Sequence, residues 1–104
     1  MNELNTCINL NLYRVFYYVA KEKSISKAAK KLYISQPAIS KSLKKLEEEL
    51  NVELFVRNLS GVEITKAGLQ LFEHVEKAAN NLNGIIPMLK KYDTLDTSAK
   101  YYKI

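Results

Sequence analysis

The sequence predicts a mainly α-helical fold, in which three short helices and a two-stranded hairpin are followed by one long helix. Two observations lead to this prediction. Apolar residues recur every three or four positions along four segments of the chain, a spacing typical of helices that bury one face. Between the third and fourth segments, two short apolar runs flank a turn at 58–61, which is typical of a hairpin.

The first helix is predicted over residues 9–21. Its apolar stripe keeps helical spacing and consists of Leu12, Val15, Phe16 and Val19. We expect Phe16 to lie at the centre of the core. The tyrosines beside this stripe are interpreted as packing residues with solvated hydroxyls, in preference to residues that stack on bases.

A second, shorter helix is predicted over residues 27–33, with Ser26 as its N-cap. Ala28 and Ala29 are small, so another helix can approach closely at this point. A turn at 34–35 then leads directly into the next helix. Two helices joined by a turn of about three or four residues, the second with a polar N-terminal half, form the helix-turn-helix pattern.

The third helix, predicted over residues 36–50, is the segment on which the functional prediction depends. Ser35 is a favoured N-cap, and Pro37 lies in the first turn, where its missing amide costs no hydrogen bond. One face is apolar and consists of Ile39, Leu43, Leu46 and Leu50. The other face is polar and consists of Gln36, Ser40, Lys41, Lys44 and Lys45. Because short polar groups can reach base edges and lysines can reach phosphates, we predict an anchoring face and a reading face.

Charge is unevenly distributed along this chain, whose net charge is +5. Seven lysines and no acids lie between positions 23 and 45, whereas four acids and no bases lie between positions 47 and 53. A block of one sign beside a polar helix face indicates a polyanionic partner, although charge alone is equally consistent with a solvated lysine face. The acids at 47–49 are interpreted as a solvated helix end that points away from DNA, and Asn51 as a left-handed helix stop.

The hairpin is predicted from strands at 54–57 and 62–64, which form a wing whose Leu54, Phe55 and Ile64 pack back on the helices. Arg57 lies at the edge of this wing and can touch phosphate or enter a minor groove, with an ordinary surface arginine as the alternative. The hydroxyls that can bond to phosphate, in addition to any capping role, are those of Ser24, Ser26 and Ser35.

The long helix is predicted over residues 66–92, with Thr65 as its N-cap. It carries a heptad seam formed by Phe72, Val75, Ala79, Leu82, Ile86 and Leu89. This seam runs too far to be covered by one small domain, so we predict pairing with the same helix of a second chain. Packing against its own domain remains the alternative for the first part, around Leu69 and Phe72. Poor helix formers and Pro87 predict a kink or break near 83–87.

Several classes of protein are excluded by what the sequence lacks. With one histidine, one cysteine, no glycine-rich phosphate loop and no apolar cluster of carboxylates, we predict neither an enzyme nor a metal site. Cys7 alone cannot form an internal disulfide, which fits the reducing cytoplasm. No secretory signal and no apolar run long enough to span a bilayer are found, so no membrane partner is expected.

Six segments of the chain together carry a family resemblance. They are residues 16–20, 24–32, 35–41, 46–50, 54–57 (Leu-Phe-Val-Arg) and 65–68 (Thr-Lys-Ala-Gly). In this order and spacing they resemble the DNA-binding domain of LysR-type transcriptional regulators. The resemblance covers roughly residues 10 to 90 by this pattern comparison.

The resemblance implies a winged helix-turn-helix over residues 1–65, whose third helix enters the major groove and whose wing reaches the flanking minor groove. It implies that 66–92 is a linker helix, which pairs antiparallel in a homodimer. The implied base contacts come from Gln36, Pro37, Ser40 and Lys41. The implied backbone contacts come from Ser26, Ser35, Lys44, Arg57 and Thr65, to which the charge and hydroxyl patterns add Ser24, Lys27 and Lys45. The expected dimer interface consists of Leu69, Phe72, Val75, Ala79, Leu82, Ile86 and Leu89.

Members of this family continue into a two-lobed effector-binding domain, which would begin near Ile104. We therefore expect a fragment that ends in a hinge or disordered tail at 93–104 and that needs no cofactor, since a small-molecule inducer would bind the missing domain. The expected partners are a double-stranded DNA operator and a second copy of the chain, with RNA polymerase as a candidate for the full-length protein. The alternative is a helical dimerisation module without specific DNA binding, against which the lysine block argues.

Overall fold

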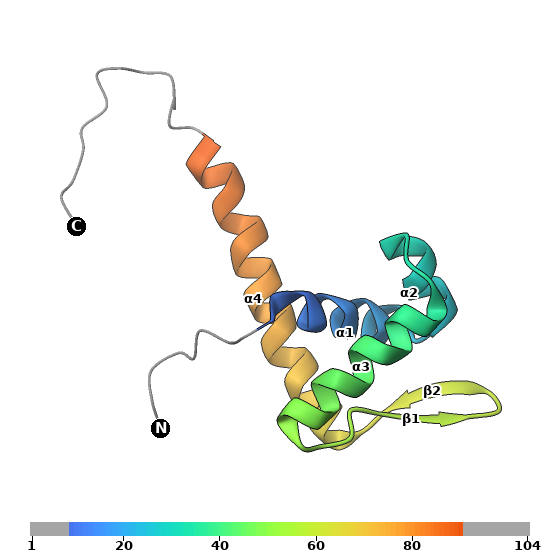
Figure 1. The fold of residues 1–104 in the computed structure, drawn as a ribbon. Helices are drawn as coiled ribbons and strands as arrows, with labels where there is room; N and C mark the ends of the chain where they lie inside the picture. The colour runs from blue at the N-terminus through green and yellow to red at the C-terminus, as the bar shows by residue number, and fades with distance from the viewer. Residues whose placement is uncertain (1–8, 91–104) are drawn as a thin grey trace, which may run out of the picture.

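The computed structural model describes residues 9–90, and its helices and strands follow the predicted order (Figure 1). The elements are α1 (Leu10–Glu22), α2 (Ile25–Leu32), α3 (Gln36–Leu50), β1 (Phe55–Asn58), β2 (Gly61–Ile64) and α4 (Lys66–Lys90). The first three helices pack together, the hairpin lies along α3, and α4 extends away from them. The predicted mainly helical fold with a two-stranded wing is confirmed. The predicted tail at 93–104 and Cys7 lie outside the described residues.

The core lies between α1, α2, α3 and the start of the hairpin. Its buried residues are Leu12, Val15, Phe16, Val19, Ala28, Ala29, Leu32, Ile39, Leu43, Leu46 and Leu54. The ring of Phe16 is fully buried and packs against the ring of Phe55, with centroids 5.5 Å apart. Phe16 therefore occupies the central position predicted for it, and it joins the helices to the wing.

The α1–α2 turn is tighter than predicted, and α2 begins earlier. Lys23 ends α1 in the left-handed conformation, with φ 56°, and its amide donates to the carbonyl of Val19. Ser24 is therefore the next residue in extended conformation, and its Oγ accepts the amide of Lys27 at 3.1 Å. The prediction that Ser26 caps this helix is wrong, because Ser26 already lies in the first turn of α2.

Helix α3 begins and ends at the predicted residues. Ser35 Oγ accepts the amide of Ala38 at 3.2 Å, and Pro37 lies in the first turn. Asn51 adopts the left-handed conformation with φ 56° and donates its amide to the carbonyl of Glu47. The residues that cap α3 at its two ends were therefore predicted correctly.

The hairpin is antiparallel, with Phe55 opposite Ile64 and Arg57 opposite Val62. Leu54 precedes the strand instead of starting it, and its side chain is part of the core. The carboxylate of Glu47 accepts the amides of Leu54 and Phe55 at 2.7 and 3.2 Å. Glu47 is thus half-buried and holds the wing to α3, whereas the sequence predicted a solvated helix end.

The start of α4 is held closely against the hairpin. Thr65 Oγ1 donates to the carbonyl of Glu53 at 2.6 Å and accepts the amide of Gly68 at 3.0 Å. A Cβ added at Gly68 would overlap the carbonyl oxygen of Leu54 and lie 2.7 Å from Cγ1 of Ile64. Only glycine allows this approach, so Gly68 sets the direction in which α4 leaves the wing.

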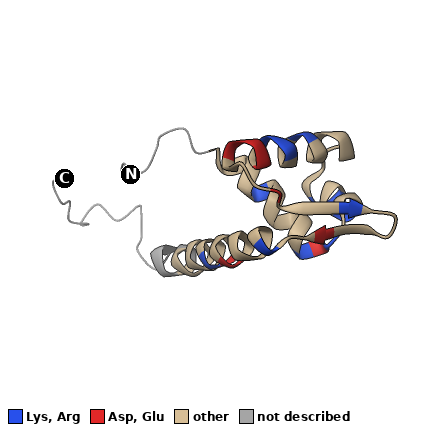
Figure 2. Ribbon diagram, turned by 90° about the horizontal axis from the view of Figure 1, so that it is seen from below, with Lys and Arg blue, Asp and Glu red and all other residues tan. Residues whose placement is uncertain are grey.

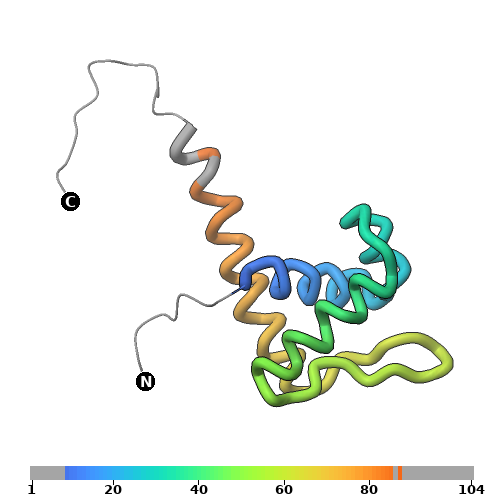
Figure 3. The backbone as a smooth tube through the Cα atoms, viewed as in Figure 1, coloured from blue at the N-terminus to red at the C-terminus, as the bar shows by residue number. Residues whose placement is uncertain are grey.

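Helix α4 is continuous from Lys66 to Lys90, with Pro87 inside it, so the break that was one of the two predicted outcomes near 83–87 does not occur, and the kink stays a prediction. Figure 3 shows α4 as one unbroken coil along its coloured part. Proline removes one amide from the helix ladder, the one that would donate to the carbonyl of Asn83. Asn83 and Pro87 are both exposed, so water can satisfy that carbonyl and the helix can continue. In the described part of the chain, no helix is long and apolar enough to cross a membrane.

Among the described side chains of α4, those of its first half pack against the rest of the domain. The ring of Phe72 stacks on that of Tyr17, with centroids 5.5 Å apart. Nζ of Lys21 lies 5.4 Å from the centroid of the Tyr17 ring and donates to the Tyr17 hydroxyl at 3.2 Å. That hydrogen bond raises the pKa of Lys21 above its ordinary value. Farther along α4, Leu82 and Ile85 are exposed.

Candidate nucleic-acid interface

The polar face of α3 is turned outward because its apolar face is seated on α1 and α2. Ile39, Leu43 and Leu46 are buried in the core, which fixes the rotation of the helix. The opposite face is exposed at Gln36, Pro37, Lys41, Lys44 and Lys45, and half-exposed at Ser40. The predicted anchoring face and outward polar face are therefore both present on α3.

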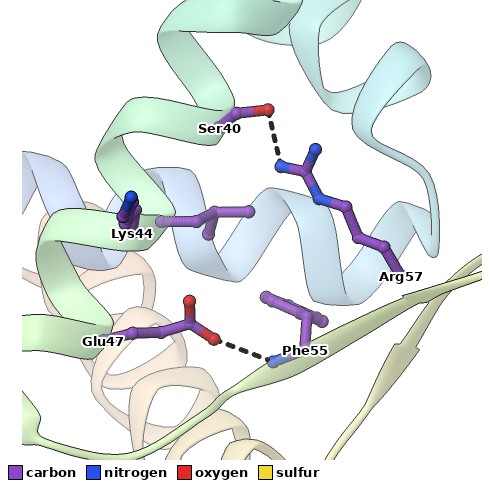
Figure 4. A pocket seen from close by; sticks show the side chains of 6 residues that line it. Ser40, Lys44, Glu47, Phe55 and Arg57 are labelled. Carbon is purple, nitrogen blue, oxygen red and sulfur yellow. Dashed lines mark hydrogen bonds between the residues drawn. The ribbon is translucent and has the colours of Figure 1, made fainter.

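The wing reaches this outward face through one side chain. Arg57 Nη2 donates to Ser40 Oγ at 2.6 Å, which joins β1 to the middle of α3 (Figure 4). Between the two elements lies an open groove of about 390 Å³, lined by Ser40, Leu43, Lys44, Glu47, Phe55 and Arg57. The structure thus brings the predicted base-contacting Ser40 and the predicted backbone-contacting Arg57 into direct contact.

A second cleft, of about 330 Å³, lies between the start of α2 and the wing. Among the side chains that line it are Ser24, Ser26, Arg57 and Ser60. Two of the three serines predicted to contact phosphate therefore line the same cleft as the wing arginine, although they are far from it in sequence. The start of a helix and an arginine that line one cleft are features typical of an anion-binding environment.

Charge is segregated along α3 in the way the sequence predicts. The lysines at 41, 44 and 45 are exposed in the middle of the helix, whereas Glu48 and Glu49 are exposed at its C-terminal end (Figure 2). Among the described residues, one ion pair is formed, between Lys31 and Glu22 at 3.5 Å. The other lysines of the block, Lys27 included, have no carboxylate partner in the described part and leave a positive surface around the reading face.

Thr65 is not brought together with the other predicted backbone contacts. It lies at the open end of the hairpin, beside Glu53, and its hydroxyl both donates and accepts within the chain. The single proton of a threonine hydroxyl can serve only one strong hydrogen bond at a time. The structure therefore shows Thr65 as the cap of α4, held by its neighbours.

Two exposed side chains beside the interface had no signal in the sequence. Tyr33 is almost fully exposed in the turn before α3, and Leu59 is fully exposed at the tip of the wing. Neither belongs to a periodic stripe, so periodicity could not identify them. The Asn58 side chain accepts the amide and hydroxyl of Ser60, at 3.0 and 2.8 Å, which orders the wing tip around Leu59.

The predicted dimer seam on α4 is divided between two environments. Phe72 and Val75 are half-buried against the core of their own chain, so this part follows the alternative interpretation. Ala79 is half-buried, whereas Leu69 and Leu82 are exposed. The side chains of Ile86 and Leu89 lie outside the described residues.

Comparison with known proteins agrees with this geometry. The family model of bacterial regulatory helix-turn-helix proteins of the lysR family matches residues 10–69. An uncharacterized HTH-type transcriptional regulator of Escherichia coli K12, YbdO, is 40% identical over 83 residues, which are 80% of this chain and 28% of the relative. The regulator BudR of Klebsiella aerogenes is 46% identical over 66 residues, which are 64% of this chain and 46% of the relative. The chain thus spans less than half the length of these curated relatives.

Solved structures of DNA-binding domains on DNA share the fold. The BenM domain in complex with the catB site 1 DNA has a TM-score of 0.74 and 34% identity, and the match covers 81% of this chain and 94% of that one. The CbnR domain in complex with DNA has a TM-score of 0.69 and 30% identity, and the match covers 81% of this chain and 95% of that one.

Proposed function

The chain belongs to the lysR family of bacterial regulatory helix-turn-helix proteins, and from this premise we propose that it binds double-stranded DNA in a sequence-specific manner to regulate transcription. The observation that carries the proposal is the outward polar face of α3, which is surrounded by exposed lysines that lack carboxylate partners in the described part. A helix of this width fits the major groove of B-form DNA.

Each proposed contact follows from the chemistry of its side chain. Gln36 can pair with the edge of an adenine, Lys41 with guanine acceptors, and the ring of Pro37 can pack against a thymine methyl group. Ser40 is the fourth proposed base contact. Lys44 and Lys45 lie farther along α3 and are proposed to neutralise phosphates, together with Lys27 at the start of α2.

We propose further that the DNA-bound form is a homodimer joined through α4. The exposed Leu82 and Ile85 lie beyond the part of α4 that packs on α1, and a second α4 would remove them from water. Leu82→Glu is expected to shift the chain toward monomer in sedimentation equilibrium, because it places a charge in the seam. Asn80→Glu puts the same charge on the opposite face of α4 and should leave the dimer intact. Equal behaviour of the two variants would contradict this interface.

The remaining partners belong to the whole regulator. A small-molecule inducer and RNA polymerase are proposed as partners of regions beyond residues 9–90, and no cofactor is proposed for the described residues. A location in the cytoplasm, where the DNA lies, follows from the same proposal.

The decisive experiment is a selection of bound fragments from random DNA, followed by titration of affinity against salt. We expect one recurring site and an affinity that falls steeply with salt, because several phosphates release counterions. Gln36→Ala should relax the preference at one base pair, whereas Lys45→Ala should weaken binding to all sequences and lower the salt slope by about one. A chain that dimerises but binds cognate and scrambled DNA equally would be the dimerisation module instead.

A further inference from the structure

One hydrogen bond joins two residues that the sequence predicted to contact DNA. Arg57 Nη2 donates to Ser40 Oγ at 2.6 Å, across 17 positions of sequence. The two side chains act on DNA independently of each other only if this bond breaks on binding. The geometry around it indicates that the bond is retained instead.

Both ends of the bond are held by the backbone. Ser40 directly follows Ile39, whose side chain is fully buried in the core. Arg57 is opposite Val62 in the hairpin, and Val62 packs against the core from β2. At the other end of the groove, Glu47 accepts two amides at the start of β1. The wing is therefore attached to α3 at two points. Figure 4 shows the Arg57 side chain extended from β1 toward Ser40 on α3.

This hydrogen bond determines what the Ser40 hydroxyl can do. A guanidinium has donors only, so Oγ of Ser40 is the acceptor in the bond. The positive charge of Arg57 also orients the hydroxyl dipole, with the proton directed away from it. In the described part of the chain, Ser40 donates to no protein acceptor, so this proton is available to a molecule outside.

We propose that Arg57 is a positioning residue, which holds the Ser40 hydroxyl as a hydrogen-bond donor toward the major groove. The inference rests on the proposed DNA-binding function. A donor at this position favours base acceptors, which are N7 and O6 of guanine, N7 of adenine and O4 of thymine. It disfavours the amino groups of cytosine and adenine. Arg57 thus acts on sequence preference through Ser40, without contacting DNA itself.

The test is a double-mutant cycle on the DNA-bound protein, with Ser40→Ala, Arg57→Met and the double variant. Affinities are measured for the selected site and for sites changed at single base pairs. We expect Ser40→Ala and Arg57→Met to lose about two- to tenfold discrimination at the same base pair, the value of one hydrogen bond. The double variant should lose no more than either single variant, since both remove the same interaction.

Two further variants separate positioning from a direct contact. Arg57→Lys keeps a positively charged donor and should restore part of the lost discrimination. Lys44→Met removes a charge from the same groove and should lower the salt slope while it leaves discrimination intact. If Arg57→Met instead lowers the salt slope, keeps discrimination and adds to Ser40→Ala, Arg57 is a phosphate contact and the inference is wrong.

Two other outcomes are also decisive. Loss of discrimination at every base pair in Arg57→Met, including the one that Gln36→Ala affects, would show a displaced wing and contradict a role through Ser40. A wild-type chain without any preferred site would overturn the proposed function itself, whichever way the cycle came out.

Discussion

Helices α3 and α4 both carry an apolar stripe, but the chain covers most of the first and only part of the second. On α3, Ile39, Leu43 and Leu46 are at most 4% exposed. On α4, Leu69 and Leu82 are 49% and 64% exposed. The covered stripe fixes the rotation of α3, whereas much of the stripe on α4 remains open to solvent.

The difference distinguishes the contacts that fix the fold of the chain from the surface that is left for a second molecule. Because α3 is seated by residues of its own chain, its reading face is formed before any second molecule arrives. Helix α4 is anchored at its start, by Thr65 and Gly68, and by the stacking of Phe72 on Tyr17. Its distal half stays exposed at Leu82 and Ile85, where the proposed homodimer would form.

The largest effect is expected from the covered stripe. Leu46→Ala should lower the free energy of unfolding by about 2–5 kcal/mol, because it opens a cavity in the core. Leu82→Ala makes the same chemical change on α4 and should cost less than about 1 kcal/mol in the isolated chain, because the exposed side chain leaves no cavity behind. Urea denaturation at a protein concentration low enough to prevent dimerisation measures both. Similar losses would contradict the comparison.

A smaller effect is expected from two glycines of α4. Gly68→Ala should destabilise the domain by about 1–3 kcal/mol, since its methyl group would overlap Leu54 and Ile64. Gly84→Ala has open space around it and should stabilise the helix by up to about 1 kcal/mol. Thermal unfolding followed by circular dichroism compares them. Opposite shifts in Tm would locate the anchored and free ends of α4, and shifts of the same sign would refute that division.

The smallest effect is expected from the caps of the two helices. Ser35→Ala should cost about 1 kcal/mol, because one amide of α3 loses its partner. Thr65→Ala should cost up to about 2 kcal/mol, since it also removes the bond to Glu53. The two free energies of unfolding are again measured in urea. A larger loss at Ser35 would show that the start of α4 is less firmly held than its hydrogen bonds indicate.

Local signals predicted the parts of the fold that local physics controls. The cap at Ser35, the left-handed Asn51 and the buried stripe of α3 each depend on residues within a few positions of one another. The cap of α2 was misplaced because Ser24 and Ser26 have the same side chain, and only the left-handed Lys23 decides between them.

The sequence predicted which residues belong to the interface but not which of them contact one another. No spacing in the sequence indicates that Arg57 meets Ser40, since the contact requires the hairpin to fold back on α3. The contact of Glu47 with the wing could not be predicted for the same reason, because its two amide partners lie seven and eight positions away, at the start of the hairpin. The kink or break expected near Pro87 followed from proline and poor helix formers alone, whereas the exposure of Asn83 and Pro87 lets water reach the carbonyl that loses its amide partner.

The left-handed helix ends have a consequence for how far this domain can be improved. Lys23, Tyr33 and Asn51 all have φ of 56–58°, and none of them is glycine. Such a backbone costs a residue with a Cβ roughly 1–2 kcal/mol, although asparagine tolerates it better. Glycine at position 33 would recover part of that energy without altering the core or α3. Substitutions at these turns can therefore raise the free energy of unfolding, and the gain could offset destabilising substitutions in the reading face.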